Sequence, residues 1–109
     1  MASNAGPKSK VYRTLRKQHP KAFDAIENLG KALRRSGPLN KRVSHLVQLA
    51  ASAAIRSEGA VHSHTRRALA AGASPDEIHH ALLLLASTIG FPNVIAAMSW
   101  ADDVIHKRR

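Results

Sequence analysis

The sequence predicts a small all-α protein, and three features of its 109 residues support this fold class. Apolar residues make up 44% of the chain and aromatic residues only 4%, so alanine and leucine supply most of the apolar side chains and favour helix over strand. In several segments apolar side chains recur at spacings of three and four, which is the period of an amphipathic helix. Typical helix starts and stops separate these segments.

The first two expected helices lie in the basic part of the chain. Residues 1–8 resemble a flexible tail in composition, and residues 9–109 are expected to form a single helical domain. A short helix is expected over about 9–18, because Pro20 stops it and opens the next helix. That second helix ends at the Ser-Gly-Pro sequence of 36–38. Its apolar stripe comprises Phe23, Ile26, Leu29, Gly30 and Leu33.

Three or four further helices follow, giving about five to six in all. Asn40 is a good N-cap for a helix that continues to about Ile55. A break is expected over 57–59, and the helix after it ends at Gly72, a residue that readily adopts the left-handed conformation of a C-cap. The last helix is expected to open at Pro92.

The clearest local signal is the start of the fifth helix. Ser74 and Glu77 have the spacing of a capping box, in which each side chain bonds the backbone of the other, and Pro75 occupies the first helical position. The helix expected over 78–89 is apolar on nearly every side between Ala81 and Leu85. Because a chain of this length can hardly cover such a helix on all sides, we expect an obligate homo-oligomer.

Composition also limits the possible functions. The chain has no cysteine, which excludes disulfides, thiolate metal sites and cysteine nucleophiles. The longest apolar run, 81–86, is far too short for a membrane span, and the N-terminus does not have the pattern of a secretory signal, so a cytoplasmic location without membrane association is expected. No cofactor is indicated.

The positive charge is concentrated in the first part of the chain. Residues 1–42 contain 11 of the 17 lysines and arginines but only two of the seven acidic residues, a net charge of +9. Such a segment could bind nucleic acid or another polyanion non-specifically. The alternative is an ordinary solvated helix surface. Tyr12 is the only aromatic residue among the basic ones before Lys21, so a platform for base stacking is lacking.

From about residue 38 to 105 the sequence resembles the carboxymuconolactone decarboxylase and alkylhydroperoxidase D superfamily. The segments that carry the resemblance are LNKRVSHLVQLAASAA and HTRRALAAGASPDEIHHALLLLASTIGFPNVIAAMSWADDVI. The shared order is a His eight residues before a Gly, an Ala-Ser-Pro-Asp-Glu-Ile helix start, an apolar helix and a Gly-Phe-Pro turn. The resemblance implies an all-helical fold of the alkylhydroperoxidase D type that assembles into trimers or hexamers.

The resemblance also implies where a site would lie. In the peroxidase branch a Glu, a Cys-x-x-Cys pair and a His form a relay, and these positions correspond to His45, Ser57 with Ala60, and His64. Thiol peroxidase activity is excluded because a serine and an alanine cannot form the required disulfide. In the decarboxylase branch the motif His also corresponds to His64. The acidic residues that usually precede it are absent, and Glu58 stands two residues too early.

The candidate site therefore centres on His64. We expect His45 and His64 to approach each other across a pocket with Ser57 nearby, forming a catalytic set in which His64 takes a proton from a small acid or lactone. Arg66, or Arg67 beside it, could hold a carboxylate of the substrate, with Glu58 as a further binding residue. A purely structural role for His64 is the alternative.

No metal site is indicated, because no pair of histidines has the His-x3-His spacing and no third ligand is evident.

Two classes of function other than an enzyme remain open. A non-enzymatic basic oligomer that binds polyanions through residues 8–42 is a different class of function, and a purely structural oligomer is another.

Overall fold

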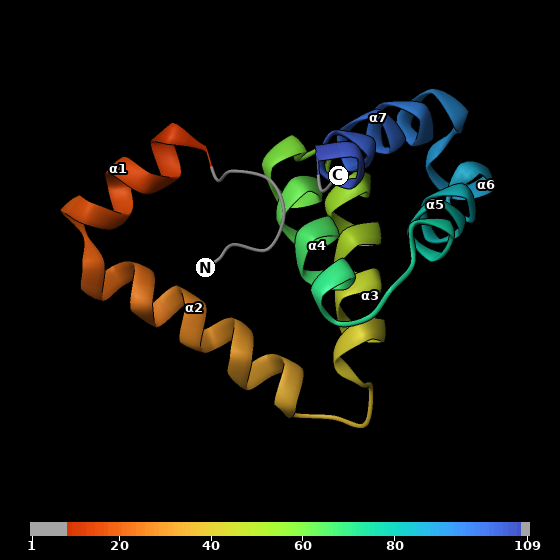
Figure 1. Ribbon diagram of the computed structural model, residues 1–109. Helices are drawn as coiled ribbons and strands as arrows, with labels where there is room; N and C mark the ends of the chain where they lie inside the picture. Colours follow the sequence, from red (N-terminus) through yellow and green to blue (C-terminus); the bar gives the residue numbers. More distant parts are fainter. Residues whose placement is uncertain (1–8, 108–109) are drawn as a thin grey trace.

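The computed structural model describes residues 9–107 and confirms the all-α fold (Figure 1). The expected tail, 1–8, and residues 108–109 lie outside the described residues. The helices are α1 (Lys10–Gln18), α2 (Pro20–Arg35), α3 (Lys41–Ala54), α4 (Glu58–Ala70), α5 (Pro75–Leu83), α6 (Ala86–Ile89) and α7 (Phe91–Lys107). None of the helices in this part of the chain is long and apolar enough to cross a membrane.

The core is built from α3, α4, α5 and α7. Figure 1 shows α3 and α4 side by side, with α7 across one end of the pair and α5 to one side, and the helix contacts agree with this arrangement. Each helix contributes fully buried apolar side chains at helical spacing, among them Leu49, Val61, Ile78 and Ala97. Small residues line much of α7, which lets it approach α4 closely.

The N-terminal helices α1 and α2 form an arm, residues 10–35, that stands away from the core (Figure 1). No residue of either helix is buried. The two helices are joined by polar contacts, since the Tyr12 hydroxyl donates to Glu27 Oε2 at 2.6 Å and Arg16 pairs with Asp24 at 2.6 Å. The apolar stripe expected on α2 is present, but its residues stay largely exposed. The exposed fractions are 63% for Ile26, 58% for Leu29 and 60% for Leu33.

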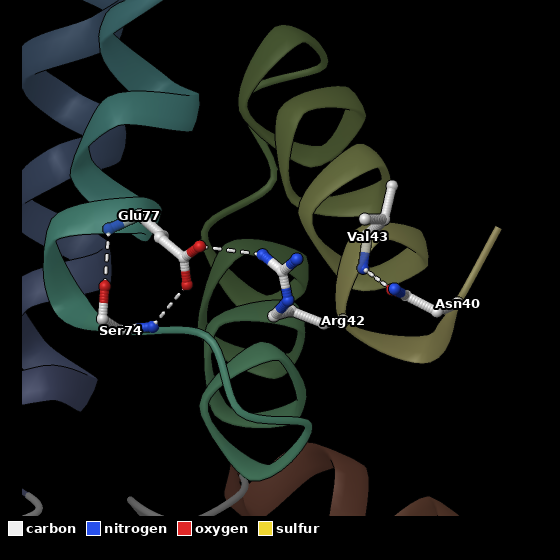
Figure 2. A network of polar contacts seen from close by, with 5 residues as sticks. All are labelled: Asn40, Arg42, Val43, Ser74 and Glu77. Atoms are coloured by element: carbon white, nitrogen blue, oxygen red, sulfur yellow. Dashed lines mark hydrogen bonds and ion pairs between the residues drawn. The ribbon is translucent and has the colours of Figure 1, made fainter.

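Most helix starts match the capping residues predicted from the sequence. The Asn40 side chain accepts a hydrogen bond from Val43 N at 2.8 Å, and Ser74 and Glu77 form the complete capping box. Figure 2 shows that the Glu77 carboxylate also accepts from Arg42 at 2.8 Å. This ion pair ties the start of α5 to the start of α3.

The helix predicted over 78–89 is interrupted in the structure. Its first part, α5, ends at Leu83, and the short α6 begins at Ala86. At the junction the Leu85 amide bonds the Leu82 carbonyl at 3.1 Å, a three-residue spacing that breaks the α-helical register. Leu82 is fully buried, whereas Leu83 and Leu84 are 51% and 63% exposed. This apolar segment is therefore only partly covered by the rest of the chain.

Candidate functional site

The two histidines singled out from the sequence lie in contact. His45 on α3 and His64 on α4 come from the tightly packed central pair of helices, and their Nδ1 atoms are 3.3 Å apart. The ring centroids are 5.5 Å apart and the planes are tilted by 37°. His45 is 1% exposed and His64 is half-buried. The structure thus agrees with the expectation that these two side chains meet.

Both imidazoles are neutral at neutral pH. Burial lowers the pKa of His45 to about 4, and the positive charges of Arg34, Arg67 and Lys41 add to the effect, as would a proton on the neighbouring His64. Burial likewise lowers the pKa of His64 to about 4, assisted by Arg67, Arg34 and Arg66. A neutral imidazole carries one N–H, and a ring in the Nδ1–H tautomer can donate to the Nδ1 of the other ring across the 3.3 Å gap.

A cavity of about 480 Å³ lies where the arm faces α3 and α4. His45 lines this cavity, and His64, which is not among the lining residues, contacts His45. The lining residues include five cationic side chains: Lys31, Arg34, Lys41, Arg66 and Arg67. Tyr12, Ser63 and Glu27 add polar groups to the lining. The volume suits a small organic molecule, and the cationic lining suits an anion.

The arginines of this cavity have no carboxylate partner within residues 9–107. Glu27 is the one acidic residue in the lining, and it is engaged by Tyr12 at 2.6 Å and by Arg16 at 3.5 Å. Burial lowers the pKa of Arg66, as does its neighbour Arg67. Burial and the charges of Arg67 and Arg35 lower the pKa of Arg34 in the same way. The cavity therefore concentrates positive charge that its own residues do not neutralise.

Ser57 and Glu58 lie outside the cavity lining. The Ser57 hydroxyl is the N-cap of α4 and accepts from Ala60 N at 3.3 Å. Glu58, in the first turn of α4, points toward His62 at 3.8 Å. Of the five predicted site residues, the structure brings together His45, His64 and Arg66, and it gives Ser57 a capping contact.

Sequence analysis missed the cavity residues contributed by the arm. Tyr12, Lys31 and Arg34 precede the segment in which the family resemblance was recognised. A local signal was present, because Lys31 and Arg34 are three residues apart and so share one face of α2. That spacing does not reveal which part of the fold the face approaches.

The chain belongs to the carboxymuconolactone decarboxylase family. The family model matches residues 20–103, so the similarity extends through α2 and beyond the segment recognised from the sequence. The all-helical fold of the described residues is consistent with this assignment.

One sequence relative and two solved structures are similar to this chain. The chain is 27% identical over 90 residues to the uncharacterized protein MJ1511 of Methanocaldococcus jannaschii, a match that covers 83% of this chain and 84% of the relative. Its fold is similar to that of apo-lpg0406, a carboxymuconolactone decarboxylase family protein of Legionella pneumophila, with a TM-score of 0.75, 19% identity and coverage of 90% and 88%. A carboxymuconolactone decarboxylase candidate of Burkholderia xenovorans LB400 is similar with a TM-score of 0.68, 22% identity and coverage of 97% and 88%.

Proposed function

We propose that this protein binds a small organic acid or its lactone in the cavity between the arm and the α3–α4 pair. The observation that carries the proposal is the group of Arg34, Arg66 and Arg67 around one cavity without a carboxylate partner in the described chain. Guanidinium groups hold carboxylates through paired, charge-assisted hydrogen bonds. An anion in this cavity would replace repulsion among like charges by attraction to all three.

The histidine pair supplies acid–base groups beside such a ligand. In the neutral pair, the ring whose Nδ1–H donates has an unprotonated Nε2, and the accepting ring carries its proton on Nε2. The pair therefore presents one proton acceptor and one donor at the same time. When the free Nε2 takes a proton from the ligand and the other Nε2–H gives one back, transfer of the bridging proton between the two Nδ1 atoms leaves both rings neutral with their roles exchanged. His64, as expected from the family motif, and His45 together are the groups proposed to move a proton of the bound acid or lactone.

Isothermal titration with a panel of small mono- and dicarboxylic acids tests the binding step. Arg66→Gln and Arg34→Gln are expected to weaken binding of the best ligand about tenfold or more, because each removes a charge-assisted contact. Arg35→Gln is the matched control, since Arg35 is exposed and does not line the cavity. The Arg35 variant should bind like the parent protein.

Two results would contradict the proposal. One is that no acid of the panel binds, and that mass spectrometry of the freshly purified protein finds no small acid. The other is equal binding by the Arg66, Arg34 and Arg35 variants. If binding is normal but His64→Ala changes neither affinity nor any turnover of the ligand, the cavity binds anions and His64 has no part in it.

Non-specific binding of nucleic acid through residues 8–42 is a second candidate. It is favoured by the exposed lysines and arginines of the arm, such as Arg13, Lys17 and Lys21. However, Lys31 and Arg34 of the same segment line the cavity, so part of the positive charge of the arm faces the proposed acid site. A gel shift whose affinity falls steeply with salt, and that is weakened by Lys17→Gln with Lys21→Gln, would support this candidate.

A further inference from the structure

A second group of ligand-type side chains lies on the junction between α4 and α7. Glu58 and His62 are one helical turn apart on α4, and Asp103 projects from α7 beside them. The Nε2 atom of His62 is 3.1 Å from Asp103 Oδ2 and 3.8 Å from Glu58 Oε2. One donor atom from each of the three residues lies within 4.8 Å of the other two. We propose that Glu58, His62 and Asp103 form a binding site for a divalent transition-metal ion, with Zn²⁺ as the best match.

The spacing of the three atoms fits a metal ion of this kind. Nitrogen and oxygen ligands lie about 2.1 Å from zinc, so two ligands of one ion are about 3.0 to 3.4 Å apart in octahedral or tetrahedral geometry. The observed separations of 3.1 and 3.8 Å are near that range. The third separation, between the two carboxylates, is within 4.8 Å, and an ion would draw these partly exposed side chains closer together.

The helix packing fixes the positions from which the three side chains reach out. Val61 and Thr65, on either side of His62, are fully buried, as is Ala101 on α7, and Val104 next to Asp103 is 3% exposed. Because these neighbours pack in the core between α4 and α7, the backbone beneath the three donors is held in place. Binding would not have to order a loop, which lowers its entropic cost.

The ionic partners of the two carboxylates are consistent with this assignment. The chain has 17 lysines and arginines and seven acidic residues, so a surface carboxylate would ordinarily find a lysine or arginine. Pairings of this ordinary sort do occur, as in Arg16 with Asp24 and Arg42 with Glu77. Within the described chain, by contrast, the ion pairs of Glu58 and Asp103 are with His62 alone.

The chemistry of the three donor groups limits which metal ion would bind. One imidazole and two carboxylates favour Zn²⁺, Co²⁺ or Ni²⁺ over Mg²⁺ and Ca²⁺, which prefer all-oxygen sites. Three protein ligands leave the remaining positions to water or another small molecule. Sequence analysis missed this site because the third ligand lies 41 residues from His62 in the chain and comes close only through the packing of α7 on α4.

Calorimetric titration of the full chain with Zn²⁺ tests the site, and the visible absorption of bound Co²⁺ reports its ligands. One equivalent is expected to bind at the site, with no comparable binding of Mg²⁺. His62→Gln and Asp103→Asn should weaken Zn²⁺ binding at least about tenfold, since even indirect ligand contacts have effects of that size. The matched controls are His19→Gln and Asp76→Asn, which remove an exposed imidazole and an exposed carboxylate elsewhere.

The same experiment separates the proposal from its competitors. Equal Zn²⁺ affinity in Asp103→Asn and Asp76→Asn would overturn it and leave a simple imidazole–carboxylate contact. A loss of Zn²⁺ binding in Asp102→Asn alone would also overturn the proposal. Asp102 belongs to a separate cluster, 2.6 Å from His79 and 3.9 Å from His106. Circular dichroism of the metal-free variants checks their folding. His62 also lines the cavity of the proposed acid site, whereas Asp103 does not, so Asp103→Asn distinguishes loss of metal binding from loss of acid binding.

Discussion

The imidazole of His45 is held in an unusually dry and positively charged setting. It is 1% exposed, its Nδ1 faces His64, and Arg34, Arg67 and Lys41 all disfavour its protonation. Burial is the main reason that the histidine pair stays neutral, and the cations that would attract an anionic ligand add to this effect.

This setting predicts a loss of stability in mild acid. The pKa of His45 is about 4 in the folded protein against an ordinary value of 6.5, so between these pH values the unfolded chain binds the proton more strongly. Stability present above pH 6.5 is therefore lost as the pH falls toward 4, by about 3 kcal/mol at most for this residue. Thermal or urea unfolding at a series of pH values measures the effect.

The control for this prediction is the variant His45→Asn, which replaces the titrating ring by a neutral side chain. Its overall stability will be lower because a buried group is changed, so the informative quantity is the slope of stability against pH. That slope should be smaller than in the parent protein between pH 6.5 and 4. An unchanged slope would show that His45 does not titrate as described.

For these side chains, the sequence was informative wherever a recognisable motif existed. His45 and His64 were predicted to meet, and their Nδ1 atoms do so at 3.3 Å. Lys31 and Arg34 were not assigned to the site, because their place beside the cavity depends on how the arm folds back toward α3 and α4. The orientation of the arm relative to the core depends on the linker 36–40 and on tertiary contacts. Neither produces a periodic pattern in the sequence.

At the beginning of α4, Ser57 has a structural role to be weighed against the catalytic role expected from the sequence. The chain turns at Arg56, whose φ of +57° lies in the left-handed region, and Ser57 then caps α4 through Ala60 N. A serine in this geometry satisfies a backbone donor that would otherwise be unpaired.

We expect Ser57→Ala to destabilise the protein by about 1 kcal/mol, the usual value for loss of an N-cap. Ligand binding measured at a temperature where the variant is fully folded should be unchanged, because Ser57 does not line the cavity. Ser57→Asp retains a capping oxygen and should restore most of the stability. Impaired ligand binding in the folded alanine variant would instead assign the hydroxyl to the site.

Helix starts were better predicted than helix continuity. Asn40 and Ser74 cap α3 and α5 as expected, since a capping side chain acts within three residues of its own position. The interruption between α5 and α6 was not predicted, because residues 84–85 are two leucines and neither glycine nor proline marks the break. It arises where Leu82 is buried and the next two leucines are left at the surface.

The complete fold leaves a continuous apolar surface between α3 and α5. A groove of about 380 Å³ is lined by Val43, Leu46, Val47, Ala50, Ala81, Leu84 and Leu85, together with Glu77 and His80. Val47 and Leu84 are 54% and 63% exposed. Exposed apolar surfaces of this kind mark association sites, and we propose that this groove contacts another copy of the chain.

Leu84→Glu is expected to lower the molar mass of the particle measured by light scattering after size-exclusion chromatography, because it places a charge in an apolar contact. Thr14→Glu, at an exposed position on α1, introduces the same charge as a control and should leave the mass unchanged. A parent protein that elutes as a monomer at high concentration would contradict the proposed association.

The separation of the arm from the core has a consequence for the kinetics of ligand exchange. One wall of the cavity belongs to helices without a buried residue, whereas the other belongs to the packed α3–α4 pair. Regions with few buried contacts open at a much smaller free-energy cost than the core. A ligand of the proposed cavity would therefore enter and leave through local opening of the arm while the histidine pair keeps its geometry, and different residues would set its residence time and any proton transfer.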